Sequence, residues 1–567
     1  MNLANQRYFY SLLLVAITVA AAFSAAPSWT TSASTVRSWS TDKFDELIDK
    51  YGSFGGAFAI VRNGETLVSH VKGESRIGTD WDEAKTLFRL GGTSKAFAHT
   101  TFWREYSHGG KFKLSENVND YVRDNNIWRV DLNFLEPVTI SHLLTGTSGF
   151  DNQILGQEAI TGARRKALST YTEYESPSRI YPPGRYHAEK NFDTVLLAYL
   201  MEQETGDSYE DLVSSDIFDK ANMTSTYQRL KASIAADSNL ARSYPLKKGS
   251  LPSSISGGAD NTPYNLDAYM NSWPAMGAIS TLSDCTSFMR GLLGTSAAST
   301  TPATTFMAAT AVNAMFAEAW TFDEQSSLAS SMASGWHRRK QENVTLLEVT
   351  GDFANFHSGF HLIPEQNTGI FMVTNTEGGD NVQTDFLDAF LREYFEKYHP
   401  EWDSALENNK FFHEEASKYQ GFYYSLTHSQ NTFFKIFNIL QYKVVVYPQI
   451  VEDDRVYLSV DGREYIEEEP LVFRAKGDIY NTLAFQIDDD GSVTYMFGGE
   501  PENVTAPTSH NVYKKFEPIN APLAEYVYIG LCVVIFVSSW WWPVVALLQF
   551  ASLGSNVPDI TDHDLEA

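Results

Sequence analysis

The chain has 567 residues, too many for one ordinary compact domain, and its length predicts two folded units beside targeting segments. An apolar fraction of 43% and a charged fraction of 20% are typical of a globular protein and argue against a disordered chain. The formal net charge of −27 argues against nucleic acid as a partner, because nucleic-acid binding needs a concentrated basic surface. The two cysteines, Cys285 and Cys532, lie in different regions, so we expect no intramolecular disulfide framework.

Apolar segments near both ends predict a membrane-anchored protein of the secretory pathway. Residues 1–24 have the layout of a signal peptide, with Arg7 before an apolar stretch that ends in small residues. The segment 526–551 is apolar over about 25 residues, enough to cross a hydrocarbon core of about 30 Å. A short acidic tail, 552–567, follows it. We therefore expect the main body outside the cell or in a lumen, with the tail inside.

Three Asn-x-Thr sequons agree with passage through the secretory pathway and predict glycosylation at Asn222, Asn343 and Asn503.

The positive-inside rule opposes an orientation with the main body outside, because Lys514 and Lys515 then lie on the outer side while the tail has no Lys or Arg. A cleaved signal peptide imposes the orientation more strongly, so we keep it as the expectation.

The first elements in chain order are a helix and two strands. The pattern predicts a helix over Asp42–Tyr51, with Ser40 or Thr41 as its N-cap. Strands are predicted over Gly56–Val61 and Thr66–Val71, with a tight turn between them. This order predicts a hairpin that follows directly on a helix.

Later segments complete a mixed α and β pattern. Helical periodicity covers Asn191–Thr205 and stops at Gly206, and Gly369–Asn375 reads as a buried strand. Hairpins at both ends of the region 42–400 predict an antiparallel sheet flanked by helices. From 414 to 516, alternating Tyr, Val and Phe predict a small all-β domain, either a sandwich or a barrel.

One short motif carries chemical meaning. The segment Phe88–Phe97 reads Phe-Arg-Leu-Gly-Gly-Thr-Ser-Lys-Ala-Phe. It resembles the Ser-x-x-Lys motif of serine β-lactamases, penicillin-binding proteins and their esterase relatives, including the class C β-lactamases. Residues three apart share one helix face, so in this motif the lysine can deprotonate the serine. Lys95 stands at the lysine position, whereas Gly92 stands at the serine.

Two further motifs of the same family match in order along the chain, and so do the segments Val138–Gly149 and Pro274–Asp284. The family's Tyr-x-Asn motif corresponds to Glu189-Lys190-Asn191, with Glu189 at the tyrosine and Asn191 kept. Its His-x-Gly or Lys-x-Gly motif corresponds to Val349-Thr350-Gly351, with Val349 at the basic residue and Gly351 kept. A second register, His357-Ser358-Gly359, fits by its letters but breaks the neighbouring matches.

The resemblance implies an α+β fold of the β-lactamase/transpeptidase type over 42–400, followed by the all-β domain and the transmembrane segment. Each motif has lost its reactive side chain, which predicts a catalytically inactive protein that binds or scaffolds. Its partner would be an unknown small molecule, peptide or protein. No cofactor and no metal are expected. His357 and His361 share a strand face, but no third metal ligand is evident nearby, so ordinary packing is expected.

Physical reasoning adds two expectations about the altered site. Lys95 would face Glu189, and a Lys–Glu ion pair would offset the desolvation of both charges. Gly92 would leave more room than a serine. The alternative is an active hydrolase of esterase or D-amino peptidase type with a rewired site, in which Ser94, or a water activated by Glu189 and Lys95, carries the reaction.

Overall fold

The computed structural model describes most of the central part of the chain. Described residues are 31–122, 129–130, 133–153, 155–159, 162–245, 269–294, 306–322, 331–341, 344–395, 416–432, 435, 443–450, 456–477, 481–498, 511–516, 526–527 and 530. The predicted signal peptide 1–24, the sequon residues Asn343 and 503–505, the tail 552–567 and nearly all of 526–551 lie outside them. Among the described residues, no helix combines the length and apolarity needed to cross a bilayer.

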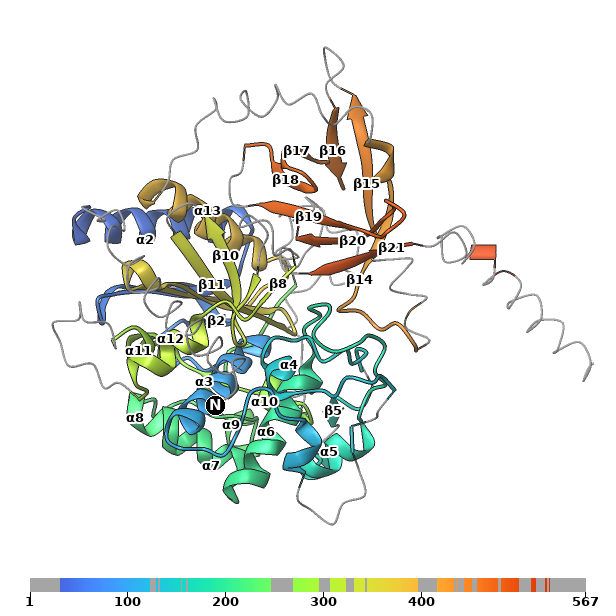
Figure 1. Cartoon of the computed structure of the whole chain (residues 1–567). Coiled ribbons are helices and arrows are strands. Elements are labelled where there is room, and N and C mark those ends of the chain that lie inside the picture. Colours follow the sequence, from blue (N-terminus) through green and yellow to red (C-terminus); the bar gives the residue numbers. More distant parts are fainter. Residues whose placement is uncertain are drawn as a thin grey trace, which may run out of the picture.

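The first folded unit is built on a nine-stranded antiparallel sheet, with the strand order β3-β2-β1-β13-β12-β11-β10-β9-β8 (Figure 1). Segments about 300 residues apart in the chain meet in it, because β1 pairs with β13 in continuous register, from Gly56 with Thr374 to Arg62 with Thr368. The strands are β1 Gly55–Arg62, β2 Glu65–Arg76, β3 Thr79–Asp80, β8 Trp320–Thr321, β9 Ser331–Met332, β10 His337–Gln341, β11 Val344–Phe353, β12 Phe356–Ile363 and β13 Thr368–Thr374.

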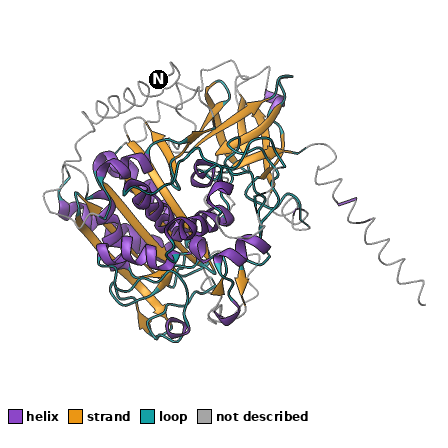
Figure 2. Cartoon of the chain, turned by 60° about the horizontal axis from the view of Figure 1, so that its bottom comes forward, coloured by secondary structure: helices purple, strands orange, loops and turns teal. Residues whose placement is uncertain are grey.

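Helices cover both faces of this sheet (Figures 1 and 2). On one face, α2 (Ala33–Lys50) and α13 (Asp380–Tyr394) pack together over a smaller apolar core. The other face carries the larger core and the remaining helices. These are α3 Lys95–Ser107, α4 Ile140–Leu144, α5 Leu168–Tyr174, α6 Asn191–Thr205, α7 Tyr209–Val213, α8 Asp219–Ala221, α9 Ala232–Ala235, α10 Trp273–Met276, α11 Leu282–Leu293 and α12 Ala309–Phe316.

Alternation along β1 explains how one strand serves both cores. Ala57 and Ala59 enter the core beneath α3 and α11, whereas Phe58 and Ile60 enter the core beneath α2 and α13. Successive strand residues point to opposite faces of a sheet, so a strand covered on both faces is apolar throughout. Two short strand pairs lie outside the main sheet: β4 (Phe88–Arg89) with β7 (Ile279–Ser280), and β5 (Glu158–Ala159) with β6 (Tyr269–Met270).

The predicted elements are present, with one correction at the first helix. The helix of 191–205 and its left-handed stop at Gly206 (φ 85°) form as predicted, and the strand predicted over 369–375 forms one residue earlier, as Thr368–Thr374. The N-cap prediction for Ser40 or Thr41 is wrong. Helix α2 begins at Ala33, where the Ser32 hydroxyl accepts a hydrogen bond from the backbone N–H of Thr35. The buried face of α2 starts at Val36, and Ser40 lies one turn later on the same face. Ser40 is therefore a buried residue within the helix.

The second folded unit is a closed barrel, which decides between the two all-β forms that the sequence allowed. Its interior is filled by large side chains, among them Tyr423, Tyr465, Phe473 and Phe485. Closure removes the exposed strand edges that an open sheet would present. Its strands are β14 Gly421–Ser425, β15 Lys443–Ile450, β16 Val456–Val460, β17 Arg463–Glu469, β18 Val472–Ala475, β19 Thr482–Ile487, β20 Val493–Gly498 and β21 Val512–Lys515.

The barrel packs against the first unit through a small aromatic cluster. The rings of Tyr186 and Tyr495 stack with centroids 4.2 Å apart, and Leu426, Phe497 and Val512 join the same buried cluster. Tyr186 lies three residues before Glu189. The contact between the two units therefore lies next to the second motif.

Candidate functional site

The first motif forms the single 3-10 turn η1 (Gly91–Ser94), and α3 begins at Lys95 directly after it. Gly92 is fully buried against β11. A β-carbon placed on Gly92 would lie 2.9 Å from the carbonyl oxygen of Thr350 and 3.3 Å from Cα of Gly351. Both atoms belong to the backbone, which cannot turn aside as a flexible side chain can. The expectation of extra room at Gly92 is therefore wrong, because the strand fills that space.

The third motif is the part of β11 that touches this turn. A β-carbon on Gly351 would lie 2.3 Å from the carbonyl oxygen of Leu90 and 2.3 Å from the backbone nitrogen of Thr93. Only glycine permits this approach of strand and turn. Val349, two residues earlier, is 3% exposed and belongs to the larger apolar core. The structure thus brings the first and third motifs together in the register that the sequence favoured.

Lys95 and Glu189 form the ion pair that the sequence led us to expect. Lys95 Nζ lies 2.7 Å from Glu189 Oε1. The other carboxylate oxygen, Oε2, lies 3.3 Å from Nε2 of His337, the first residue of β10. Burial would raise the pKa of Glu189, but the Lys95 charge and the His337 hydrogen bond outweigh it and hold this pKa well below its ordinary value. Glu189 is therefore a carboxylate between two nitrogen donors.

His337 is one of the site residues that the sequence motifs did not reveal. It pairs with Glu348 of the neighbouring strand. The pairing of β10 with β11 therefore ends at the residue before the third motif, which starts at Val349. Its imidazole stands edge-on to that of His187, with ring centroids 5.4 Å apart. Lone histidines in short strands carry no spacing signal, and no local pattern could have identified this one.

Asn191, the retained member of the second motif, is engaged with a neighbouring loop. It is the first residue of α6, and its side-chain amide donates a hydrogen bond to Gln157 Oε1 at 2.8 Å. This hydrogen bond directs the Asn191 amide toward the segment that contains Gln157.

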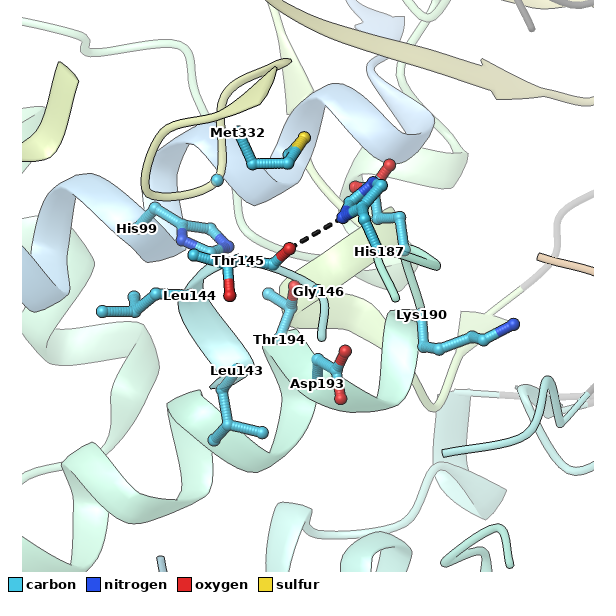
Figure 3. Close-up of a pocket in the computed structure, with 12 residues that line it drawn as sticks. His99, Leu143, Leu144, Thr145, Gly146, His187, Lys190, Asp193, Thr194 and Met332 are labelled. Atoms are coloured by element: carbon cyan, nitrogen blue, oxygen red, sulfur yellow. Dashed lines mark hydrogen bonds between the residues drawn. The ribbon is translucent and has the colours of Figure 1, made fainter. Parts of the chain in front are cut away.

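A cavity of about 20 Å³ remains between these elements, with room for about one water molecule (Figure 3). His99 from α3 and Asp193 from α6 line it, and Nδ1 of His187 makes a 2.7 Å hydrogen bond with the carbonyl oxygen of Thr145. Burial lowers the pKa of His99 to about 4 and that of His187 to about 3, so both rings are neutral near pH 7. Burial also raises the pKa of Asp193 to about 7. The cavity is too small for an organic ligand.

Gly146, in the segment Val138–Gly149, stands where the corresponding segment of the family has a histidine. Gly146 has a φ of +64°, and a β-carbon there would lie 2.8 Å from Cε1 of His187. The imidazole of His187 thus occupies the space beside Gly146. The position that lacks a histidine therefore contacts another histidine, His187, which lies two residues before Glu189.

The barrel is tied to the same region by two buried charged residues. The Lys190 side chain turns away from the cavity (Figure 3), and its Nζ donates to the carbonyl oxygen of Leu426 at 2.5 Å. The Asp151 carboxylate accepts hydrogen bonds from the backbone nitrogens of Gln430, at 2.7 Å, and Asn431, at 2.9 Å. Burial lowers the pKa of Lys190 to about 8. The loop after β14 is thereby held against the residues that flank the second motif.

Ser94, the alternative nucleophile, is built into the local backbone. Its hydroxyl donates to the carbonyl oxygen of Gly91 at 2.6 Å and accepts from the backbone nitrogen of Ala278 at 3.0 Å. The residue is 0% exposed. Its hydroxyl therefore fixes the turn to the backbone at Ala278 and makes no capping hydrogen bond to α3.

The two strand histidines pair with carboxylates of the neighbouring strand β11. His357 Nδ1 contacts Asp352 Oδ1, and His361 Nδ1 lies 3.0 Å from Glu348 Oε1. Glu348 also forms a two-pronged ion pair with Arg339. Each histidine thus has its own carboxylate partner, as ordinary packing predicts, and neither contacts Gly92 or Glu189.

Two solved structures resemble this chain over most of its length. An octameric penicillin-binding protein homologue from Pyrococcus abyssi aligns over 86% of this chain and 100% of its own, with 16% identity and a TM-score of 0.50. The structure of SurE aligns over the same shares, with 15% identity and a TM-score of 0.57. At these identities the likeness concerns the fold alone.

Sequence comparison supplies the family. A protein of Bacillus subtilis (strain 168) described as the penicillin-binding protein PbpX is 29% identical over 175 residues, which span 30% of this chain and 40% of PbpX. Residues 41–392, well over half of the chain, match the profile of the Beta-lactamase family. With the matching order of its motifs and its fold, the chain belongs to the β-lactamase family.

Proposed function

We propose that this member of the β-lactamase family is catalytically silent and acts by binding or scaffolding. The observation that carries the proposal is the environment of Gly92. Acyl transfer through a Ser-x-x-Lys motif needs a side-chain nucleophile. Loss of the nucleophile from a serine hydrolase costs about a millionfold in kcat. Here the side chain is absent, and the backbone of Thr350 and Gly351 occupies its place.

The charges around the motif support the same proposal. An effective general base has a pKa near the working pH. Lys95 and His337 hold the pKa of Glu189 far below that range, which makes its carboxylate a weak base. Ser94 is buried with both its donor and acceptor roles in use. These features favour a structural role for the cluster over a rewired hydrolase.

Intact-mass analysis after exposure to a penicillin and to a fluorophosphonate tests the silence. We expect no covalent adduct and no turnover of a β-lactam, a phenyl ester or a D-alanyl peptide. Turnover that copurifies with the protein and disappears in Lys95→Met would overturn the proposal. Retention of that turnover in both Lys95→Met and Ser94→Ala would trace it to a contaminant.

We further propose that the folded units lie outside the cell or in a secretory lumen, tethered through 526–551. The apolar composition of that segment and the signal-peptide layout of 1–24 support the tether. Asn222, the sequon asparagine within the described residues, is exposed, and so is Thr224. Deglycosylation should therefore increase gel mobility, less so in Asn222→Gln, and alkaline carbonate should leave the protein in the membrane pellet. Release into the supernatant would refute the tether.

A further inference from the structure

A second concavity lies next to the motif cavity and shares none of its lining residues. It measures about 530 Å³ and is lined by Gly184, Arg185 and residues 318–322. Ligand pockets in proteins typically measure about 300–1,000 Å³. The size of this pocket suits an organic ligand, whereas the motif cavity of about 20 Å³ does not.

Two aromatic side chains that the barrel holds in place, Trp320 and Phe322, belong to the otherwise mostly polar lining of this pocket. Phe322 stacks on Phe497 of β20 with centroids 5.2 Å apart, and Trp320 meets the same ring edge-on at 5.7 Å. Trp320 also packs against His187, at 5.8 Å, and so separates the pocket from the motif cavity. Rings fixed by neighbours lose little conformational entropy when a planar ligand stacks on them.

A positive charge stands at the rim of the pocket. Arg185 is exposed, with its guanidinium carbon 5.1 Å from the centroid of the Tyr186 ring. No carboxylate among the described residues forms an ion pair with it. Glu318, the acidic residue of the lining, is already bound by Arg338 at 2.8 Å and by the Ser331 hydroxyl at 2.9 Å. The guanidinium therefore keeps its donors for a ligand.

We propose that this pocket binds a planar or aromatic ligand that carries an anionic group, with Arg185 on the anion and Trp320 and Phe322 against the ring system. Guanidinium groups recognise carboxylate-like anions through paired hydrogen bonds, and aromatic walls favour flat ligands. The chain carries a net charge of −27, so a local cation is needed to attract an anion here. The inference rests on the proposed binding role of the protein and names its site and ligand chemistry.

The test uses two fluorescent probes that differ in charge. Anilinonaphthalene sulfonate is anionic and aromatic, and N-phenylnaphthylamine has the same rings without the sulfonate. We expect the purified full chain to bind the sulfonate in a saturable, salt-sensitive manner. Arg185→Gln should weaken that binding about tenfold, as expected for one charge-assisted contact, and leave N-phenylnaphthylamine binding unchanged. Arg185→Lys should recover part of the loss.

Matched variants keep the result interpretable. Arg164→Gln removes another exposed arginine, at the end of the 3-10 turn η3 (Gly162–Arg164), and should leave both probes unaffected. Because Arg185 is exposed, its variants should melt at the wild-type temperature. Equal weakening by Arg164→Gln and Arg185→Gln, or no weakening by either, would overturn the proposed site. Turnover in the adduct assay would instead overturn catalytic silence, so the two failures are separable.

Discussion

Replacing Glu189 with glutamine should destabilise the first folded unit, because the substitution removes the anion from Lys95. The Lys95 side chain is 10% exposed and its Nζ lies 2.7 Å from the carboxylate. Removing one partner of a fully buried pair costs about 3–5 kcal/mol, whereas exposed pairs contribute about 0–1 kcal/mol. The Glu189 side chain is 37% exposed, so solvent screens part of the interaction. We therefore expect a loss of about 1–3 kcal/mol, between these limits.

A double-mutant cycle separates the pair from its surroundings. Lys95→Met combined with Glu189→Gln should cost less than the sum of the single changes, with a coupling of about 1–2 kcal/mol. The surface pair Lys43–Glu46, at 2.9 Å with side chains 27% and 60% exposed, is the matched control. Glu46→Gln should change stability by no more than about 0.5 kcal/mol.

Urea unfolding followed by tryptophan fluorescence measures these free energies, and pH supplies a second check. The folded pKa of Glu189 lies below its ordinary value of 4.5. The stability advantage of wild type over Glu189→Gln should therefore be complete above that value and fall as the pH drops through the lower folded pKa. A Glu189→Gln cost no larger than that of Glu46→Gln, with no coupling to Lys95, would refute the structural role of the pair.

Three further predictions concern the surroundings of this pair. Gly92→Ser should cost about 1–3 kcal/mol from overpacking and form no penicillin adduct; an adduct in its mass spectrum would show that β11 moves aside. His99 has a pKa of about 4 when folded against 6.5 ordinarily, so the unfolded chain binds its proton first and the contribution of His99 to stability should fall by about 3 kcal/mol from pH 6.5 to 4. His99→Gln should flatten this part of the unfolding curve, and parallel curves would contradict the assignment. Asp151→Asn should raise hydrogen exchange in the loop 426–432 about tenfold, and exchange equal to that of the exposed control Asp490→Asn would count against the anchor.

Local sequence patterns predicted much of the fold and located the site. Apolar alternation marked the strands, and the glycine after 191–205 marked the end of α6. The first helix was misplaced because most residues of its first turns are polar, and only Val36 and Trp39 there contact the apolar core. The spacing of the three motifs placed Gly92, Glu189 and Gly351 in one site, because such motifs encode which residues share a helix face or strand end.

Residue type alone shows which reactive groups are absent, because a glycine cannot act as a nucleophile in any fold. What fills their place could be seen only once the chain was folded. The Thr350 carbonyl against Gly92, the His337 imidazole on Glu189 and the Lys190 contact with Leu426 all join residues far apart in the chain. Contacts of this kind depend on backbone positions that the packing of whole helices and strands sets. Residue type and local spacing do not predict those positions.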